Sequence, residues 1–167
     1  LLCHEGEFEE LLAELTLHKL DTVLSDRAAP AKSELRLTSQ LLSSSPIAWY
    51  APSHWADSAS TNFPRSFANI PLLLPTRHSA VRLRIDQWLE RERIKPLIAG
   101  EFEDSALLMT FAAAGMGVFP APISIQEEIL ETHKLEQIGV CDSVDEEFHL
   151  IYTARKVLHP LLLRLLD

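Results

Sequence analysis

Three carboxylates stand close together in the stretch GEFED at residues 100–104. Glu101, Glu103 and Asp104 fall between an apolar segment that predicts a strand and another that predicts a helix. One interpretation is that these acids stabilise the helix start, with Asp104 or Ser105 as the N-cap. A second is that their oxygens lie at the end of a sheet and hold a cation or a polar ligand. A third is acid–base catalysis by the pair Glu101 and Asp104.

The stretch PTRHS at residues 75–79 forms the corresponding turn one predicted strand earlier. Thr76 and Ser79 offer hydroxyl groups and Arg77 offers a positive charge. The first backbone N–H groups of the helix that follows can bind an anion. Helix capping explains Ser79 but does not explain Arg77, so this turn is a second candidate for ligand contact.

Other chemical motifs are weak or absent. Gly115 and Gly117 follow a predicted helix and precede a predicted strand, which is the reverse of the order in a phosphate-binding loop. We therefore predict that Gly115 ends the helix with a positive φ and that Gly117 allows a tight entry into the strand. Cys3 and His4 are adjacent on a predicted strand and point to opposite faces, which disfavours a metal site. The sequence contains no GxSxG, HExxH or CxxC motif, and no cofactor is expected.

Composition excludes several functions. With 167 residues, of which 47% are hydrophobic, the chain can form one domain or two small lobes with a packed core. Its formal charge of -9 disfavours direct binding to a nucleic-acid backbone. No apolar run reaches the roughly 20 residues that span a bilayer, and no leader is evident. The two cysteines suggest neither a disulfide framework nor a zinc site, which favours a reduced, cytoplasmic setting. The start without Met suggests a fragment.

The first third of the chain predicts a β-α-β unit. Residues 1–4 form the first strand, Phe8 to Leu15 an amphipathic helix, and residues 22–25 a second, parallel strand. Two extended stretches follow at 35–42 and 46–52, separated by serines, and are expected to pass between two lobes.

Alternating strands and helices continue over the rest of the chain. In the helix after PTRHS, Val81, Ile85, Trp88 and Leu89 are expected to face the core, whereas Arg82, Arg84, Glu90 and Arg91 are expected to face solvent. The remaining predicted strands are residues 70–74, 97–99, 118–119, 135–138 and 148–153. The remaining predicted helices are a short one within 53–69, then 104–114, 124–132 and a closing one from 159. This order predicts an α/β fold with mainly parallel sheets and two lobes joined by two crossings.

Three segments together resemble the effector-binding domain of LysR-type transcriptional regulators: HEGEFEELLAELTLHKLDTVLSD, IPLLLPTRHSAVRLRIDQWL and GEFEDSALLMTFAAAGMGVFPAP. Within that family the similarity is to the branch that activates a sodium/proton antiporter gene. The resemblance implies two Rossmann-like lobes joined by two crossover strands, as in periplasmic binding proteins. It implies lobe I at residues 1–50 and 145–167 and lobe II at 51–144. It also implies that the first strand and helix of lobe I, and an N-terminal winged helix-turn-helix domain, are missing.

The resemblance also implies where an effector binds. Its effector-facing positions fall on these residues: Gly6, Glu7, Ser25, Asp26, Thr76, Arg77, His78, Ser79, Glu101 and Phe119. These are the four turns that the predicted topology selects, together with Phe119 on a predicted strand. The antiporter branch is associated with a response to sodium, and hard cations prefer oxygen ligands. Glu7, Asp26 and Glu101 are therefore the candidate sodium ligands.

The expected function is a non-enzymatic, ligand-sensing regulatory domain that acts as a homodimer or tetramer in the cytoplasm. It would take a small-molecule or ion effector, and would contact DNA only through the missing N-terminal domain. A free-standing solute-binding protein would share the same two-lobe fold, and a small α/β enzyme is a third reading.

Overall fold

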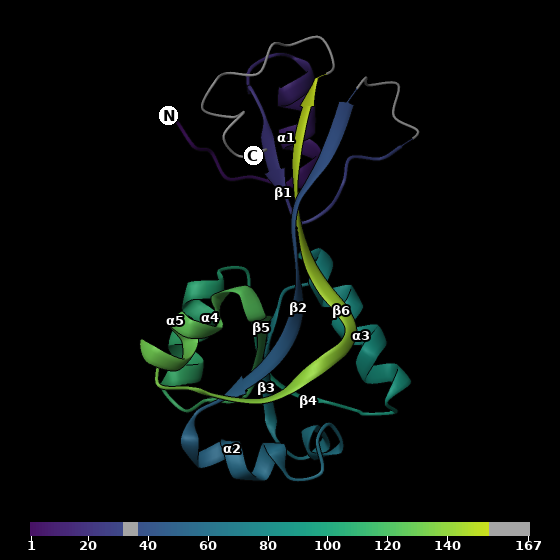
Figure 1. Cartoon of the computed structure of the whole chain (residues 1–167). Coiled ribbons are helices and arrows are strands. Elements are labelled where there is room, and N and C mark those ends of the chain that lie inside the picture. The colour runs from purple at the N-terminus through teal and green to yellow at the C-terminus, as the bar shows by residue number, and fades with distance from the viewer. Residues whose placement is uncertain (32–36, 154–167) are drawn as a thin grey trace. The chain divides into compact units, whose positions relative to one another are not determined.

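The computed structural model describes residues 1–31 and 37–153 of the chain (Figure 1). The chain divides into two compact units. Unit 1 comprises Leu1–Ser44 and Glu147–Asp167, and unit 2 comprises Ser45–Glu146. The chain passes from one unit to the other within strand β2 (Leu37–Ala51) and returns within strand β6 (Glu136–Thr153).

Unit 1 is built around one helix and one short strand. Helix α1 (Phe8–Thr16) confirms the predicted amphipathic pattern, because Leu12 and Leu15 are buried. Strand β1 (Val23–Ser25) pairs with β6, and its register places Val23 opposite Ile151. Leu12, Leu15, Val23 and Ile151 form the buried cluster of this unit.

The predicted β-α-β unit at the start of the chain is wrong. Residues 1–4 form no strand, and Leu1 and Leu2 are 108% and 81% exposed. Strand β1 runs antiparallel to β6, so it has no parallel partner in residues 1–4. A strand is stable only beside a partner that accepts its backbone hydrogen bonds, and the described part of the chain places none beside these four residues.

Unit 2 contains the parallel pair that the sequence predicts. Strand β3 (Pro71–Pro75) pairs in parallel with β4 (Leu97–Phe102), and helix α3 (Ala80–Arg91) connects them. Val118 adds a parallel bridge to Leu72 on β3. The remaining elements are α2 (Ser53–Ser60), η1 (Arg65–Ala68), α4 (Ser105–Ala113), β5 (Phe119–Pro122), η2 (Ile123–Ile125) and α5 (Gln126–Glu131).

The larger sheet differs from the predicted parallel one. Its strand order is β1-β6-β2-β5, and both β1–β6 and β2–β5 are antiparallel pairs. Strand β2 continues through the serine run, so the two predicted extended stretches belong to one strand as far as they are described. Strand β6 likewise joins the two predicted strands at 135–138 and 148–153. The closing helix predicted from 159 lies outside the described residues.

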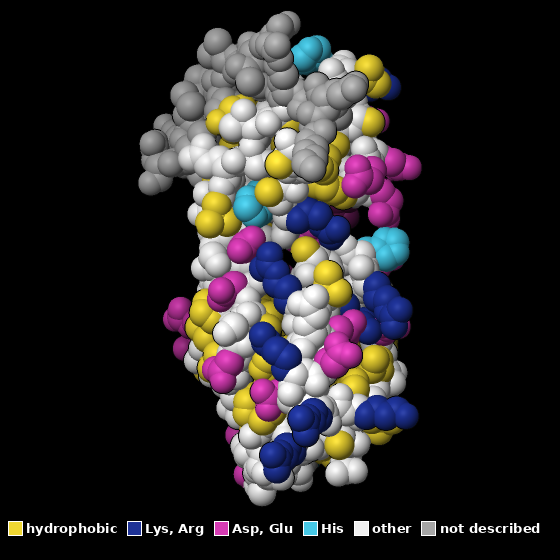
Figure 2. Space-filling model, turned by 90° about the vertical axis from the view of Figure 1, so that its right-hand side faces the viewer, with side chains coloured by type: hydrophobic (Ala, Val, Ile, Leu, Met, Phe, Trp, Pro, Cys, Tyr) yellow, Lys and Arg dark blue, Asp and Glu magenta, His cyan; other side chains and the backbone are white. Residues whose placement is uncertain are grey.

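Charged side chains of both signs share the surface. On the face drawn in Figure 2, Lys and Arg side chains are interspersed with Asp and Glu side chains and do not form one basic patch. No helix in the described ranges has the length and apolar character needed to cross a membrane.

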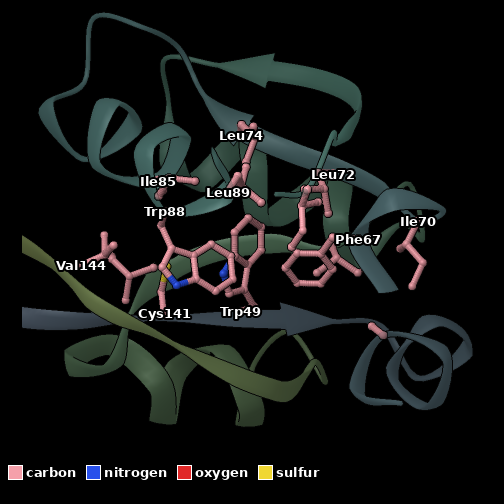
Figure 3. Packing of buried hydrophobic residues seen from close by; sticks show 14 of the residues in the cluster. Trp49, Phe67, Ile70, Leu72, Leu74, Ile85, Trp88, Leu89, Cys141 and Val144 are labelled. Carbon is pink, nitrogen blue, oxygen red and sulfur yellow. The ribbon is translucent and has the colours of Figure 1, made fainter. Parts of the chain in front are cut away.

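Strand β2 lies between the two buried clusters of unit 2. Ile47, Trp49 and Ala51 belong to one cluster, whereas Ala48 and Tyr50 belong to the other, as expected when alternate residues point to opposite faces. Figure 3 shows Trp49 against Phe67 and Trp88, with ring centroids 4.5 and 6.0 Å from that of Trp49. Burial on both faces explains why PIAWYA is a continuous apolar run.

The two glycines after α4 have the roles predicted for them. Gly115 has a φ of +94° and follows the helix, and its amide donates to the Ala112 carbonyl oxygen at 2.9 Å. A Cβ atom on Gly117 would lie 2.5 Å from the Pro71 carbonyl oxygen, so only glycine allows this close approach to β3.

Candidate functional site

In unit 1 the structure brings together the two turns that the sequence singles out. Glu7 occupies the N-cap position of α1, and Phe8 follows it. The Arg27 guanidinium, in the turn after β1, lies 5.3 Å from the centre of the Phe8 ring. The start of α1 and the end of β1 are therefore neighbours, and Gly6 lies exposed just before them.

Ser25 and Asp26 are held by the arginine that follows them. The Arg27 amide donates to the Ser25 Oγ at 3.2 Å, and its guanidinium pairs with the Asp26 carboxylate at 2.9 Å. The hydrogen bond with Asp26 is the main cause of a raised pKa of Arg27. The Asp26 carboxylate is thus paired with the Arg27 guanidinium, and this charge-assisted hydrogen bond orients it.

In unit 2 the turn after β3 is joined to the end of β4. The Thr76 amide donates to the Phe102 carbonyl oxygen at 2.9 Å, and the Ser79 amide donates to the Thr76 carbonyl oxygen at 3.2 Å. Arg77 and His78 are exposed within this turn. Ser79 takes the N-cap position of α3, but its hydroxyl makes no capping hydrogen bond.

Glu101 lies on β4 and is bonded to an arginine for which the sequence analysis predicted a solvent-facing position. The Arg82 Nη1 donates to the Glu101 Oε1 at 2.5 Å and to the Pro75 carbonyl oxygen at 2.6 Å. Arg82 is only 1% exposed, so its predicted position on the solvent face is wrong. Its spacing of three and seven residues from the buried Ile85 and Leu89 was the signal for burial.

Asp104, and Phe119 of the predicted site, have structural partners. Asp104 is the N-cap of α4, and its Oδ1 accepts from the Leu107 amide at 2.6 Å. Glu101 is therefore not the capping acid. Phe119 is buried, with its ring 5.8 Å from that of Tyr50, so its side chain belongs to the core.

The geometry gives little support to a preformed metal site. Residues 1–31 and 37–153 contain no group of three or more His, Cys, Asp and Glu side chains that could hold a metal ion. Asp26 pairs with Arg27, and Glu101 pairs with Arg82. A cation at either carboxylate would have to compete with a guanidinium group.

Two open hollows in the described part of unit 2 are lined by residues other than the predicted site residues. The larger has a volume of about 510 Å³ beside η2 and α5, and a neighbouring one has about 340 Å³. Glu127 and Glu131 line both hollows, which are shallow and acidic.

Comparison with known proteins identifies the family. The family model of the LysR substrate binding domain matches residues 1–167. Among curated proteins, the chain is 28% identical over 165 residues to the transcriptional activator protein NhaR of Escherichia coli (strain K12), which covers 99% of the chain and 54% of NhaR. The chain thus spans about half the length of this relative.

Solved structures agree on the fold. The cofactor-binding domain of the Cbl transcriptional regulator matches with a TM-score of 0.76 and 19% identity, over 96% of this chain and 70% of that one. The effector-binding domain of QuiR in complex with shikimate matches with a TM-score of 0.70 and 14% identity, over 97% of this chain and 76% of that one. These likenesses confirm the predicted α/β fold of the two-lobe, periplasmic-binding-protein-like type. The chain belongs to the LysR substrate-binding-domain family.

Proposed function

We propose that this chain is the effector-sensing domain of a LysR-type transcriptional regulator. The observation that carries the proposal is the family match over residues 1–167. The similarity to NhaR, a transcriptional activator, over nearly the whole chain supports it. A sensing domain must bind its effector with different affinity in two conformational states, and it needs no catalytic group. The proposed role is therefore regulatory and not enzymatic.

The proposed domain has lobe I at residues 1–50 and 145–167 and lobe II at residues 51–144. The division of the chain into Leu1–Ser44 with Glu147–Asp167 and Ser45–Glu146 supports lobes with boundaries close to these. In this proposal, effector binding changes the relation between the lobes. Strands β2 and β6 carry the change because both contain a crossing between units.

The proposed effector contacts come from both lobes. Support comes from contacts within each unit that join neighbouring turns. The Arg27 guanidinium lies over the Phe8 ring in unit 1, and the Thr76 amide donates to the Phe102 carbonyl oxygen in unit 2. The proposed contacts are Gly6, Glu7, Ser25 and Asp26 from lobe I, and Thr76, Arg77, His78, Ser79, Glu101 and Phe119 from lobe II. Because the Phe119 ring is buried, this residue would contribute backbone atoms.

Sodium is the effector that we propose to test first. The branch of the family that the sequence resembles is associated with sodium, and Glu7, Asp26 and Glu101 offer oxygen ligands. Calorimetric titration of the protein with sodium chloride should give a saturable signal that potassium chloride at equal ionic strength does not give. Indistinguishable behaviour of the two salts would reject sodium as the effector.

DNA binding is proposed for the full-length gene product and not for this chain. The charge of -9 opposes contact with a phosphate backbone, and family members carry a winged helix-turn-helix at the N-terminus. The proposed regulator acts in the cytoplasm as a homodimer or tetramer. Footprinting of the full-length protein on its own promoter region, with and without sodium, tests the role. Absence of any protected site would contradict a regulator, whereas an unchanged footprint would contradict only the sodium response.

A further inference from the structure

Arg82 differs from the two other arginines that α3 places near other elements. Arg84 and Arg91 donate to the carbonyl oxygens of Asp145 and Asp142, at 2.5 and 3.4 Å, and lie partly or largely exposed. Arg82, in the first turn of α3, has a side chain that is 2% exposed. A charge removed from water to this extent is tolerated only when it is paired and hydrogen-bonded.

The hydrogen bonds of Arg82 join three elements at one point. Its Nη1 donates to the Pro75 carbonyl oxygen, at the end of β3, and to the Glu101 Oε1, on β4. Its Nε donates to the Asp86 Oδ1 one turn along α3 at 2.9 Å. A single rigid guanidinium therefore fixes the end of β3, the carboxylate on β4 and the start of α3 relative to one another.

The charge of Arg82 is balanced by carboxylates that reach solvent. Burial lowers the pKa of Arg82, but hydrogen bonds with Asp86 and Glu101 outweigh burial, so that the pKa is raised. The Glu101 side chain is 46% exposed, so one edge of a carboxylate held by a buried arginine faces solvent. The turn from Thr76 to Ser79 lies between two of these bonded points, Pro75 and Arg82.

We infer that Arg82 is the positioning residue of the lobe II half of the effector site. It fixes the turn at residues 76–79, and it pairs with the Glu101 carboxylate and orients it. This inference rests on the proposed function, because the turn at residues 76–79 and Glu101 are effector contacts only in that proposal. The fixed geometry requires the planar fork of arginine and not merely a buried positive charge.

Hydrogen exchange of backbone amides in the protein tests this role without an effector. E101A removes one acceptor of Arg82 from the surface, and E103A, two residues along, is the matched control because Glu103 is exposed. In E101A we expect exchange at the Thr76 and Ser79 amides to rise about tenfold, since a hydrogen bond to a charged group is lost. The Leu107 amide, bonded to Asp104, should exchange as in the unchanged protein.

R82K separates positioning from simple charge balance. Lysine keeps the positive charge but cannot present Nε and Nη donors in one plane, so R82K should show the same local rise at Thr76 and Ser79. Full protection in R82K would overturn the inference, as would unchanged exchange in E101A or an equal rise at Leu107. If R82K does not fold, the comparison of amide exchange in E101A and E103A still tests the inference. None of these outcomes depends on sodium binding, so they are separate from the test of the proposed function.

Discussion

At the scale of single residues, two buried side chains hold protons that folding makes harder to remove. Burial raises the pKa of Tyr50 to about 12 and the pKa of the Cys141 thiol to about 12. Both residues are buried in unit 2, and the Tyr50 hydroxyl has no hydrogen-bond partner within the described ranges. Both groups therefore stay neutral in the folded protein at physiological pH.

The two cysteines should differ in reactivity for this reason. The thiolate is the nucleophile, and Cys141 forms very little of it while folded, whereas Cys3 is exposed. At pH 8, iodoacetamide should label Cys3 in the native chain and should label Cys141 only after denaturation. Mass spectrometry of tryptic peptides measures both, and the C3S variant should give no native label. Equal labelling rates at the two positions would contradict the burial of Cys141.

The same raised pKa values predict alkaline instability. The unfolded chain loses these protons near the ordinary values of 9.0 for Cys141 and 10.0 for Tyr50, before the folded chain does. The free energy of unfolding should therefore be unaffected by these groups below about pH 9 and should fall between about pH 9 and 12. Urea unfolding across this range measures the fall. Y50F and C141A should each make it shallower, and unchanged slopes in both variants would refute the assignment.

Residue-level prediction from sequence succeeded where the environment is local and failed where it is not. The roles of Gly115, Gly117 and Asp104 follow from their positions at helix ends and turns. The buried charge of Arg82 is balanced by Glu101, which lies nineteen residues away on another element. The prediction placed Arg82 on the solvent face because it is charged, although its helical spacing matched the buried residues.

At the scale of elements, helix α4 begins at a residue that can be tested directly. The Asp104 carboxylate accepts from the Leu107 amide at 2.6 Å, which satisfies one of the free donors of the first turn. D104A should lower the free energy of unfolding by about 1 kcal/mol. Chemical denaturation measures the change, with E103A as the control. Equal effects of the two substitutions would show that general charge, and not the cap, is responsible.

Gly117, just before β5, should tolerate substitution less well than Asp104. An added Cβ at Gly117 meets the Pro71 backbone at 2.5 Å, next to the Leu72–Val118 bridge. G117A should destabilise the protein by about 1–3 kcal/mol, as overpacking typically does. G6A is the matched control, because a Cβ there meets only Leu11 side-chain atoms at 3.5 Å or more. Equal thermal stability of G117A and the unchanged protein would contradict the close approach.

Helices were predicted better than strands, for a physical reason. Helix hydrogen bonds are local, so the apolar spacing of α1 and α3 is sufficient to place both within a few residues. Strand pairing joins distant segments, such as Val23 with Ile151, and the alternation in one segment does not name its partner. The expected parallel sheet was therefore correct for β3–β4 and wrong for the pairs β1–β6 and β2–β5.

At the scale of the whole molecule, the buried clusters predict which part folds alone. Both clusters of unit 2 are contained within Ser45–Glu146, whereas the cluster of unit 1 needs Ile151 together with Leu12, Leu15 and Val23. A fragment of residues 45–146 should therefore unfold cooperatively, and a fragment of residues 1–44 should not. Circular dichroism during urea titration measures both. A cooperative transition in the shorter fragment would contradict the division.

This arrangement has a consequence for the order of events during synthesis. Strand β1 is synthesised before unit 2, but it pairs with residues 149–151, which follow the whole of unit 2. Domains generally fold as complete units become available. Helix α1 and strand β1 must therefore wait for residues 149–151, and until these have been made the apolar face of α1 stays uncovered and open to aggregation.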